Sequence, residues 1–214
     1  SIGKSVDYFD KKINIKNLPR ISKIEKVNWE SIDVLFSALP NGEAQKIIKV
    51  IPEHTKLIDL SADFRINDFK LYKKWYGINH KCKKLISRSI YAITEFSKSN
   101  LDKYKIISCP GCYPTSVQIP LIPLLKRKMI NTQNIIIDSK SGYSGAGKKI
   151  KQKFRYKNLF NSVSAYGVGF HKHMVEIDQE LSKAASNKIK VSFTPHLIPM
   201  FRGILSTMYL ETRG

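Results

Sequence analysis

The sequence has few cysteines and no long apolar run. Three cysteines among 214 residues are too few for a disulfide framework, so we expect a reducing compartment. No apolar segment approaches the ~20 residues that a membrane-spanning helix requires. The first residues also lack the charged and apolar regions of a secretory signal. These absences exclude a secreted disulfide-rich domain and predict a cytoplasmic protein with no membrane partner.

Acidic residues are also scarce, with 17 Asp and Glu against 37 Lys and Arg, and the net charge is +20. Such an excess is typical of nucleic-acid-binding proteins. However, thirty of the basic residues are lysines, whereas proteins that read base sequence rely on arginine for bidentate contacts. Only residues 148–157 interleave basic and aromatic side chains, and a solvated face is the commoner explanation of such a run. We expect no nucleic-acid partner and keep a basic nucleic-acid-binding module as the alternative from another class.

The apolar pattern predicts an α/β fold. Residues 33–39 and 56–60 are continuous apolar runs, typical of strands that are covered on both faces. An amphipathic helix is predicted between them, from 43 to about 50, so this unit is βαβ and its sheet is parallel. The composition changes near residue 115, which divides the chain into domains 1–115 and 116–214. Further strands are predicted at 105–108, 135–139, 190–194 and 204–210.

Residues 108–115, Ser-Cys-Pro-Gly-Cys-Tyr-Pro-Thr, join a predicted strand to a predicted helix. This turn places Cys112 at a helix N-terminus, where the amides and the dipole favour an anion. We therefore predict a lowered thiol pKa and a nucleophilic thiolate. Cys109 and Cys112 are also spaced as a redox pair, or as part of a zinc site with His171 and His173. A buried structural cysteine is the remaining interpretation.

Five motifs follow one another in the order found in a known family. On these motifs the chain resembles the N-acetyl-γ-glutamyl-phosphate reductases, NADPH-dependent enzymes of arginine biosynthesis within the semialdehyde dehydrogenase family. The resemblance runs from about Ser31 to Leu210. It implies a Rossmann-type domain followed by an α+β catalytic and dimerisation domain. The motifs are Ser-Ala-Asp-Phe-Arg at 61–65, Pro-Gly-Cys-Tyr-Pro-Thr at 110–115, Ser-Gly-Tyr-Ser-Gly-Ala-Gly at 141–147, His-Lys-His at 171–173 and Phe-Thr-Pro-His-Leu-Ile-Pro-Met at 193–200.

The resemblance implies reduction of N-acetyl-glutamyl 5-phosphate to N-acetyl-glutamate 5-semialdehyde. Cys112 would attack the acyl phosphate, release phosphate and form a thioester, which hydride from NADPH would then reduce. His171 or His173 would serve as the acid and base, and both remain candidates. A reductase of a carrier-bound glutamyl or aminoadipyl phosphate in lysine biosynthesis is the alternative. The resemblance also implies a small-molecule substrate and a homo-oligomer, either a dimer or a tetramer.

The resemblance suggests binding residues as well. Arg65 and Arg202 offer planar guanidinium groups to a phosphate or carboxylate. Glu176 lies one turn after His173 and is expected to orient an imidazole; we place it with the two arginines among the substrate-binding residues. No metal ligand is expected. The residues expected to bind NADP are Ser37, Leu39, Pro40, Gly42, Ser141, Gly142, Ser144 and Gly145.

The sequence departs from the family pattern in several respects. Cys109 stands where the family usually has Asn. The Gly-rich fingerprint that holds a pyrophosphate is also missing, because only Gly3, Gly42 and Gly77 precede Gly111. The family's carboxy-terminal segment is missing too. We therefore expect an internal fragment, whose first domain is incomplete at its N-terminus and whose second is incomplete at its C-terminus.

Overall fold

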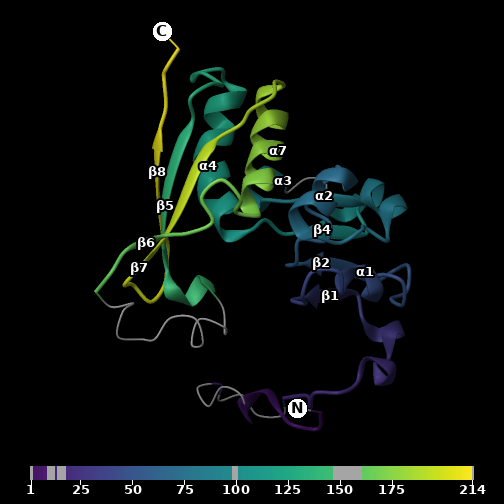
Figure 1. The fold of residues 1–214 in the computed structure, drawn as a ribbon. Coiled ribbons are helices and arrows are strands. Elements are labelled where there is room, and N and C mark those ends of the chain that lie inside the picture. Colours follow the sequence, from purple (N-terminus) through teal and green to yellow (C-terminus); the bar gives the residue numbers. More distant parts are fainter. Residues whose placement is uncertain (1, 9–12, 14–17, 98–100, 147–160, 214) are drawn as a thin grey trace.

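The structure, a computed structural model, describes residues 2–8, 13, 18–97, 101–146 and 161–213. Two four-stranded sheets lie within these residues, one in each half of the chain (Figure 1). The predicted fold class is confirmed, because a parallel Rossmann-type sheet comes first and a mixed sheet with helices follows. No helix in these ranges is long and apolar enough to cross a bilayer. The basic stretch 148–157 and Gly147 lie outside the described residues.

The first sheet has the strand order β1-β2-β4-β3, and all neighbouring pairs are parallel. Alternate residues of β2 and β4 are buried, but in β1 Val34 is 45% and Phe36 68% exposed. The expectation that residues 33–39 are covered on both faces is therefore wrong, because β1 is the edge strand within the described residues. The strands are β1 (Val34–Ser37), β2 (Lys56–Asp59), β3 (Ser89–Tyr91) and β4 (Ile106–Ser108). The α-helices of this half are α1 (Ala44–Ile47), α2 (Phe69–Tyr76) and α3 (Thr94–Ser97).

Local sequence explains where these elements begin and end. The Asp68 carboxylate accepts hydrogen bonds from two amides at the start of α2, and Gly77 ends that helix with φ at +76°. Leu57 of β2 and Ile106 of β4 are fully buried and pack in one apolar cluster with Ala44 of α1. Burial of these side chains attaches the helix to the sheet.

The strands of the first sheet end together at one edge. In the register, Ser37 pairs with Asp59, Asp59 with Ser108 and Ser108 with Tyr91. These four residues therefore form a row across the carboxyl ends of the strands. Ligands of open parallel sheets bind at this edge, so the fold directs attention to the loops that leave it.

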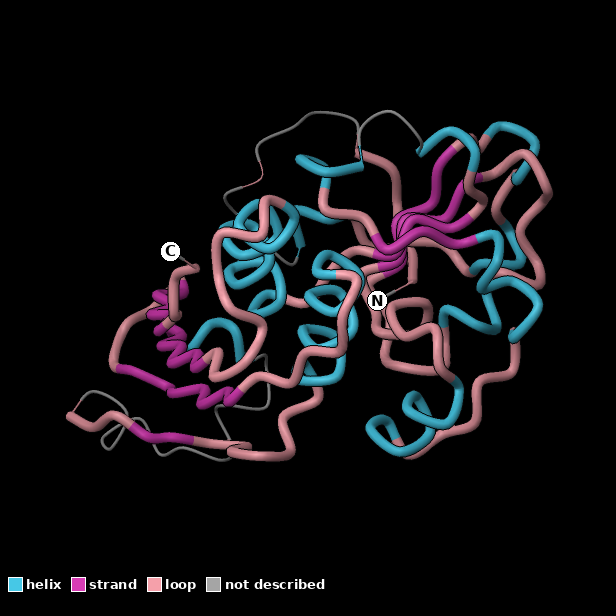
Figure 2. Tube along the Cα trace, turned by 90° about the horizontal axis from the view of Figure 1, so that it is seen from above, coloured by secondary structure: helices cyan, strands magenta, loops and turns pink. Residues whose placement is uncertain are grey.

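The second sheet has the order β6-β7-β5-β8, in which β5 is parallel to β7 and antiparallel to β8. Alternate residues of β5 are buried, as expected when one face of a sheet is covered. Helices α4 (Cys112–Lys126) and α7 (His173–Ala185) lie between the two sheets in both overall views (Figure 2). The strands are β5 (Ile136–Gly142), β6 (Ser164–Ala165), β7 (Ser192–Ile198) and β8 (Ile204–Tyr209).

One apolar core joins α4, α7 and the second sheet. Val117 of α4, Ile177 and Leu181 of α7, and Ile137 of β5 are all fully buried in it. Burial of side chains of this size stabilises a fold by roughly 1.5–3 kcal/mol each. Helix α4 thus begins at the edge of the first sheet and is anchored in the second.

Candidate active site

The loop between β4 and α4 places Cys112 at the first residue of a helix, as the sequence predicts. Gly111 precedes it in extended conformation, with φ at −67° and ψ at 161°. The Gly111 carbonyl accepts hydrogen bonds from the Thr115 amide at 2.9 Å and from the Thr115 hydroxyl at 2.8 Å. The first turn of α4 is therefore closed directly behind the cysteine. The side chain of Cys112 is exposed, whereas that of Cys109 is half-buried.

Glycine is required at position 111 because a histidine packs against it. A Cβ atom on Gly111 would lie 2.5 Å from Nε2 of His173, a separation that real Cβ atoms do not reach. His173 is the first residue of α7, so the second domain supplies this ring. The sequence pattern Gly-Cys thus serves two purposes: it caps the helix, and it lets an imidazole approach the backbone beside the thiol.

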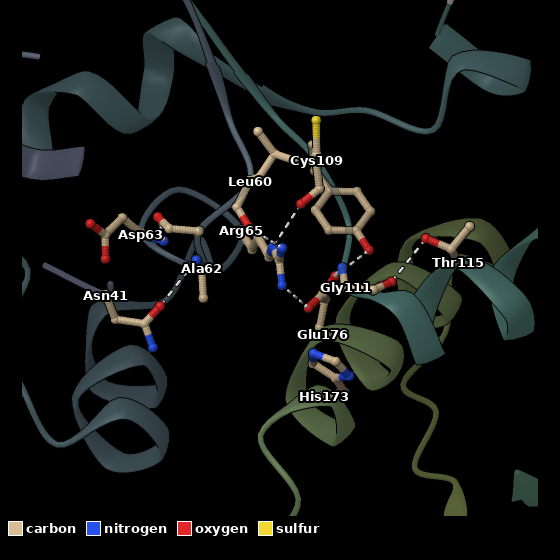
Figure 3. A network of polar contacts seen from close by, with 12 residues as sticks. Asn41, Leu60, Ala62, Asp63, Arg65, Cys109, Gly111, Thr115, His173 and Glu176 are labelled. Atoms are coloured by element: carbon tan, nitrogen blue, oxygen red, sulfur yellow. Dashed lines mark hydrogen bonds and ion pairs between the residues drawn. The ribbon is translucent and has the colours of Figure 1, made fainter. Parts of the chain in front are cut away.

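A buried carboxylate connects this loop to both halves of the chain (Figure 3). Glu176 of α7 is 0% exposed, and its Oε1 accepts hydrogen bonds from the Gly111 amide and the Tyr91 hydroxyl, each at 2.7 Å. Its Oε2 pairs with Nη1 of Arg65 at 3.3 Å. Arg65 also donates to the carbonyls of Cys109 at 2.6 Å and Leu60 at 2.8 Å. This network immobilises the backbone on both sides of the turn.

The thiol pKa of Cys112 corrects a prediction from the sequence. Although Cys112 is exposed as a residue, the chain around its thiol partly desolvates it and raises this pKa above its usual value, while the amides of Cys112 and Tyr113 lower it through hydrogen bonds. The Glu176 carboxylate raises it further, and Arg65 opposes that effect. We expected a lowered pKa from the helix N-terminus alone. That expectation is wrong because the dipole acts together with a desolvating environment, and desolvation disfavours the charged thiolate.

The two candidate histidines lie side by side, with ring centroids 4.9 Å apart. Burial lowers the pKa of His171 to about 4 and that of His173 to about 3, so both rings are neutral near pH 7 and are weak bases in this state. His171 accepts a hydrogen bond from the His173 amide through Nδ1 at 3.2 Å and makes edge contacts with Tyr113 and Phe193. Nδ1 of His173 is buried and lacks a hydrogen-bond partner within the described part of the chain.

The structure assigns Glu176 and Arg65 to this buried network rather than to an open surface. We expected Glu176 to orient an imidazole; that is wrong, because its oxygens bind Gly111, Tyr91 and Arg65. Arg65 is 7% exposed, and three protein groups accept hydrogen bonds from it. A direct contact with substrate stays a prediction for both residues. What the geometry adds is their hold on residues 109–111, the loop that leads to Cys112.

The predicted cofactor residues of the first domain lie where β1 meets the carboxyl edge. The Gly42 amide donates to both oxygens of Asp63, at 2.7 and 2.9 Å, and its φ of +93° favours glycine. The Ala62 amide donates to the Asn41 side chain at 3.3 Å, so the loops after β1 and β2 are joined (Figure 3). Leu39 and Pro40 are exposed on this loop, as their predicted role requires, and that role stays a prediction.

The predicted cofactor residues of the second domain lie at the end of β5, together with Arg202. The Gly142 and Ser144 amides donate to the carbonyls of Gly203 and Phe201, each at 2.9 Å. A Cβ on Gly142 would lie 2.8 Å from the Arg202 amide nitrogen, so this glycine permits close approach of the chain around residues 200–203. Arg202 itself is exposed, with its guanidinium over the Phe201 ring. Gly145 and the buried Ser141 lie in the same turn region.

Sequence reasoning missed several polar residues of the site. The Tyr91 hydroxyl of β3 lies 3.0 Å from Oε1 of the fully buried Gln118 of α4. The Tyr113 hydroxyl lies 2.8 Å from that of Tyr166. No sequence spacing indicates these contacts, because each one joins different elements. Within the residues that the structure describes, no cluster of three or more His, Cys, Asp or Glu side chains is arranged to hold a metal ion.

Two family models divide the chain between them. Residues 1–104 match the NAD binding domain of the semialdehyde dehydrogenases, and residues 112–214 match their dimerisation domain. Solved aspartate semialdehyde dehydrogenases have the same fold. The enzyme II from Vibrio cholerae aligns with a TM-score of 0.65 at 16% identity, covering 91% of this chain and 60% of that one. The Candida albicans enzyme with NADP aligns with a TM-score of 0.57 at 15% identity, covering 98% and 61%. The chain belongs to the semialdehyde dehydrogenase family.

Within this family the similarity is to the N-acetyl-γ-glutamyl-phosphate reductases, which confirms the resemblance seen in the five motifs. The probable chloroplastic enzyme of Arabidopsis thaliana is 43% identical over 209 residues, covering 98% of this chain and 52% of that protein. The enzyme of Afipia carboxidovorans is 45% identical over 203 residues, covering 92% and 57%. The chain thus spans about half the length of the curated relatives it matches.

Proposed function

We propose that this protein is an N-acetyl-γ-glutamyl-phosphate reductase of arginine biosynthesis. It would reduce N-acetyl-glutamyl 5-phosphate to N-acetyl-glutamate 5-semialdehyde and phosphate, with NADP as the cofactor. The observation that carries the proposal is Cys112 at the first residue of α4, with the His173 ring packed against Gly111 beside it. Relatives at 43% and 45% identity bear the name of this activity.

In this mechanism Cys112 is the nucleophile and His173 the acid and base. Neutral His173 is placed to accept the thiol proton, although burial lowers its pKa and raises that of the thiol. The amides of Cys112 and Tyr113 act in the opposite direction and stabilise the thiolate. The thiolate attacks the acyl carbon, the carbon–oxygen bond to phosphate breaks, and the proton on His173 passes to the departing phosphate. A thioester on Cys112 remains, and reduction of that thioester returns the thiolate. When bound, NADPH supplies the hydride for this reduction.

We assign the acid–base role to His173 rather than His171 because of their contacts. His171 has its Nδ1 engaged by the His173 amide and lies among aromatic rings, which is the environment of a structural histidine. His173 has an Nδ1 without a hydrogen-bond partner in the described residues, and its Nε2 faces the loop that carries the nucleophile. Its proton can therefore be exchanged without breaking a hydrogen bond within that part of the chain.

The carboxyl edge of the first sheet fits a nucleotide cofactor. The Ser37 hydroxyl, 3% exposed, lacks a hydrogen-bond partner in the part of the chain that the structure describes, as does the Ser108 hydroxyl, 0% exposed. Buried polar atoms of this kind are expected where a polar ligand binds. We place NADP against Ser37, Leu39, Pro40 and Gly42. From the second domain, Ser141, Gly142, Ser144 and Gly145 would complete this site.

The remaining parts of the proposal concern substrate, assembly and compartment. Exposed Arg202 would bind a phosphate or carboxylate of the substrate. The match to a dimerisation domain supports a homo-oligomer, and we propose a dimer or a tetramer. Three free cysteines favour a reducing compartment, so we propose the cytoplasm, although the Arabidopsis relative is named as chloroplastic.

Reverse turnover by the full-length protein tests the proposed function. We expect reduction of NADP⁺ with N-acetyl-glutamate 5-semialdehyde, dependent on added phosphate, and faster than with NAD⁺. Semialdehydes bound to an amino-group carrier protein serve as the comparison for lysine biosynthesis, and we expect them to be poor substrates. Turnover of the carrier-bound compounds alone would overturn the substrate assignment. Absence of all phosphate-dependent turnover would overturn the reductase itself.

A further inference from the structure

Tyr91 is a half-buried polar residue that the mechanism above does not use. It ends β3 in the first domain, and register places it beside Ser108. Residues 109–111, the nucleophile loop, follow Ser108 and lead to Cys112. The amide of the next residue, Ala92, donates to the Ser108 carbonyl at 3.0 Å. The Tyr91 hydroxyl lies 2.7 Å from Oε1 of Glu176 and 3.0 Å from Oε1 of Gln118. Its single proton can bond only one of them, and the carboxylate is the closer and stronger acceptor.

The contact with Glu176 leads directly to the backbone beside the nucleophile. Oε1 of Glu176 accepts from Tyr91 and from the Gly111 amide, and both distances are 2.7 Å. Glu176 is 0% exposed, so water does not replace a lost donor at the surface of this carboxylate. Removal of one donor from a buried, charged acceptor changes the position and strength of its other bonds. The amide of Gly111 is the other bond, and Cys112 is the next residue.

The elements involved indicate why this contact concerns function as well as stability. Tyr91 belongs to the sheet of the NAD binding domain, whereas Glu176 belongs to α7 of the second domain. Gly111 lies on the loop between the two domains. The hydrogen bonds from Tyr91 and Gly111 to one oxygen therefore fix that loop relative to both domains at once.

We propose that Tyr91 is a positioning residue for Cys112, acting through Glu176 and the Gly111 amide. The inference rests on the proposed function, in which Cys112 is the nucleophile. Tyr91 touches no reacting atom in this account. Its phenol keeps the buried carboxylate in place, and the carboxylate keeps the first turn of α4 and its thiol aligned for attack.

The charged and titratable groups around the Glu176 carboxylate define a matched control. This carboxylate interacts through charge or hydrogen bonds with Arg65, Tyr91, Tyr76 and Glu180. Tyr76 is a phenol close enough for Glu176 to raise its pKa, yet its hydroxyl makes no hydrogen bond within the described residues. Tyr76→Phe therefore removes the same atom from the same neighbourhood without breaking the bond at issue.

The test compares Tyr91→Phe with Tyr76→Phe in the full-length protein. For Tyr91→Phe we expect kcat to fall about tenfold while KM stays within about twofold, because alignment of the attack is lost and binding is not. The pH midpoint of Cys112 alkylation by iodoacetamide should move downward, because loss of the Tyr91 donor raises the Glu176 pKa further, and a neutral carboxyl no longer raises the thiol pKa. Tyr76→Phe should leave both readouts unchanged. Equal behaviour of the two variants would overturn the proposal.

A double-mutant cycle with Glu176→Gln tests the route through the carboxylate. If Tyr91 acts through Glu176, its replacement should cost much less in the Glu176→Gln background than in the parent protein. Additive costs would show that Tyr91 acts by another route and would overturn the proposal. Thermal melting of each variant separates misfolding from misalignment, and alkylation requires only a folded protein. Alkylation also separates the two hypotheses: an inactive parent protein contradicts the proposed function, while the midpoint still reports on Tyr91.

Discussion

The polar side chains of the two sheets differ in their burial and in their partners. At the carboxyl edge of the first sheet, Ser37, Asp59 and Ser108 are 3%, 0% and 0% exposed, and both serine hydroxyls lack a partner within the described part of the chain. In the second sheet, Asp138 of β5 pairs with Lys140 at 2.6 Å and with His196 at 3.0 Å. All three of those side chains remain partly exposed.

The two aspartates show what this difference means. Burial raises the pKa of Asp59 to about 6, although Ser61 donates two hydrogen bonds to it. The Lys140 side chain lowers the pKa of Asp138. The second sheet thus pairs Asp138 with Lys140, although Asp138 Oδ1 and His196 Nδ1 make no hydrogen bond within the described residues. The first sheet instead places two unpartnered serine hydroxyls at the edge where parallel sheets bind ligands.

The largest expected effect concerns the two cysteines of the nucleophile loop. In the full-length protein, Cys112→Ser should lower turnover by at least about 10³-fold, because the alcohol is a far weaker nucleophile than the thiolate. Cys109→Asn should keep activity, since the Cys109 carbonyl, rather than its side chain, accepts the hydrogen bond from Arg65. NADPH binding by both variants checks that the fold is intact. If Cys109→Asn loses turnover and Cys112→Ser does not, the assignment of Cys112 as the nucleophile is wrong.

The two histidines should differ next. His173→Asn should lower kcat by about 10²- to 10⁴-fold, the usual contribution of a general acid–base. His171→Asn should cost less in kcat and more in thermal stability, because His171 packs among aromatic rings. Steady-state kinetics and melting curves of both variants provide the comparison. A larger loss of kcat for His171→Asn would exchange their roles.

The pH dependence of stability should separate the two aspartates. The pKa of Asp59 in the folded protein, about 6, exceeds the usual 3.8, so the folded state holds its proton more tightly. Its stabilising contribution is fully present below pH 3.8 and is lost as pH rises through about 6. Asp59→Asn should remove this pH dependence. The expected change in the free energy of unfolding is roughly 3 kcal/mol, at 1.36 kcal/mol per pKa unit. Urea unfolding between pH 4 and 7 measures it.

Asp138→Asn provides the contrasting result. Its pKa is lowered, so its contribution is present above the usual value of 3.8 and is lost as pH falls below it. The pair is partly exposed, and solvent screens such pairs strongly. The variant should therefore leave the slope between pH 4 and 7 unchanged. A pH slope that is lost in Asp138→Asn and kept in Asp59→Asn would contradict this comparison.

The smallest expected effect concerns the glycines at the end of β5. Gly142→Ala should destabilise the protein by about 1–3 kcal/mol, because the new methyl would lie 2.8 Å from the backbone of Arg202 and Met200. Gly145→Ala should cost less, since its nearest neighbour is the Ser141 hydroxyl at 3.1 Å, which can rotate away. Equal melting temperatures for the two variants would show that the backbone around residues 200–202 gives way.

Local patterns in the sequence are sufficient to predict β1, β2 and β4 of the first sheet and the start of α4. Apolar runs mark β1 and β2, and the turn at 108–111 places Cys112 at the helix start. The network around Glu176 is different, because its partners Tyr91 and Arg65 lie 85 and 111 residues away in the chain. No spacing encodes such contacts.

The sign of the Cys112 pKa shift escaped prediction for a related reason. Helix position can be read from neighbouring residues, but desolvation depends on what packs around the thiol in three dimensions. Gly142 illustrates the same limit. Its Ser-Gly-x-Ser-Gly context suggests backbone near a ligand or another strand, and only the structure shows that residues 200–202 approach it.

Direct detection of the acyl-enzyme tests the central claim, that Cys112 is the nucleophile. The full-length protein would be mixed with N-acetyl-glutamyl 5-phosphate in the absence of NADPH, quenched in acid, digested and analysed by mass spectrometry. We predict an N-acetyl-glutamyl adduct on Cys112 that hydroxylamine removes, and none on Cys109. An adduct on Cys109, or rapid turnover by Cys112→Ser without any adduct, would contradict the account.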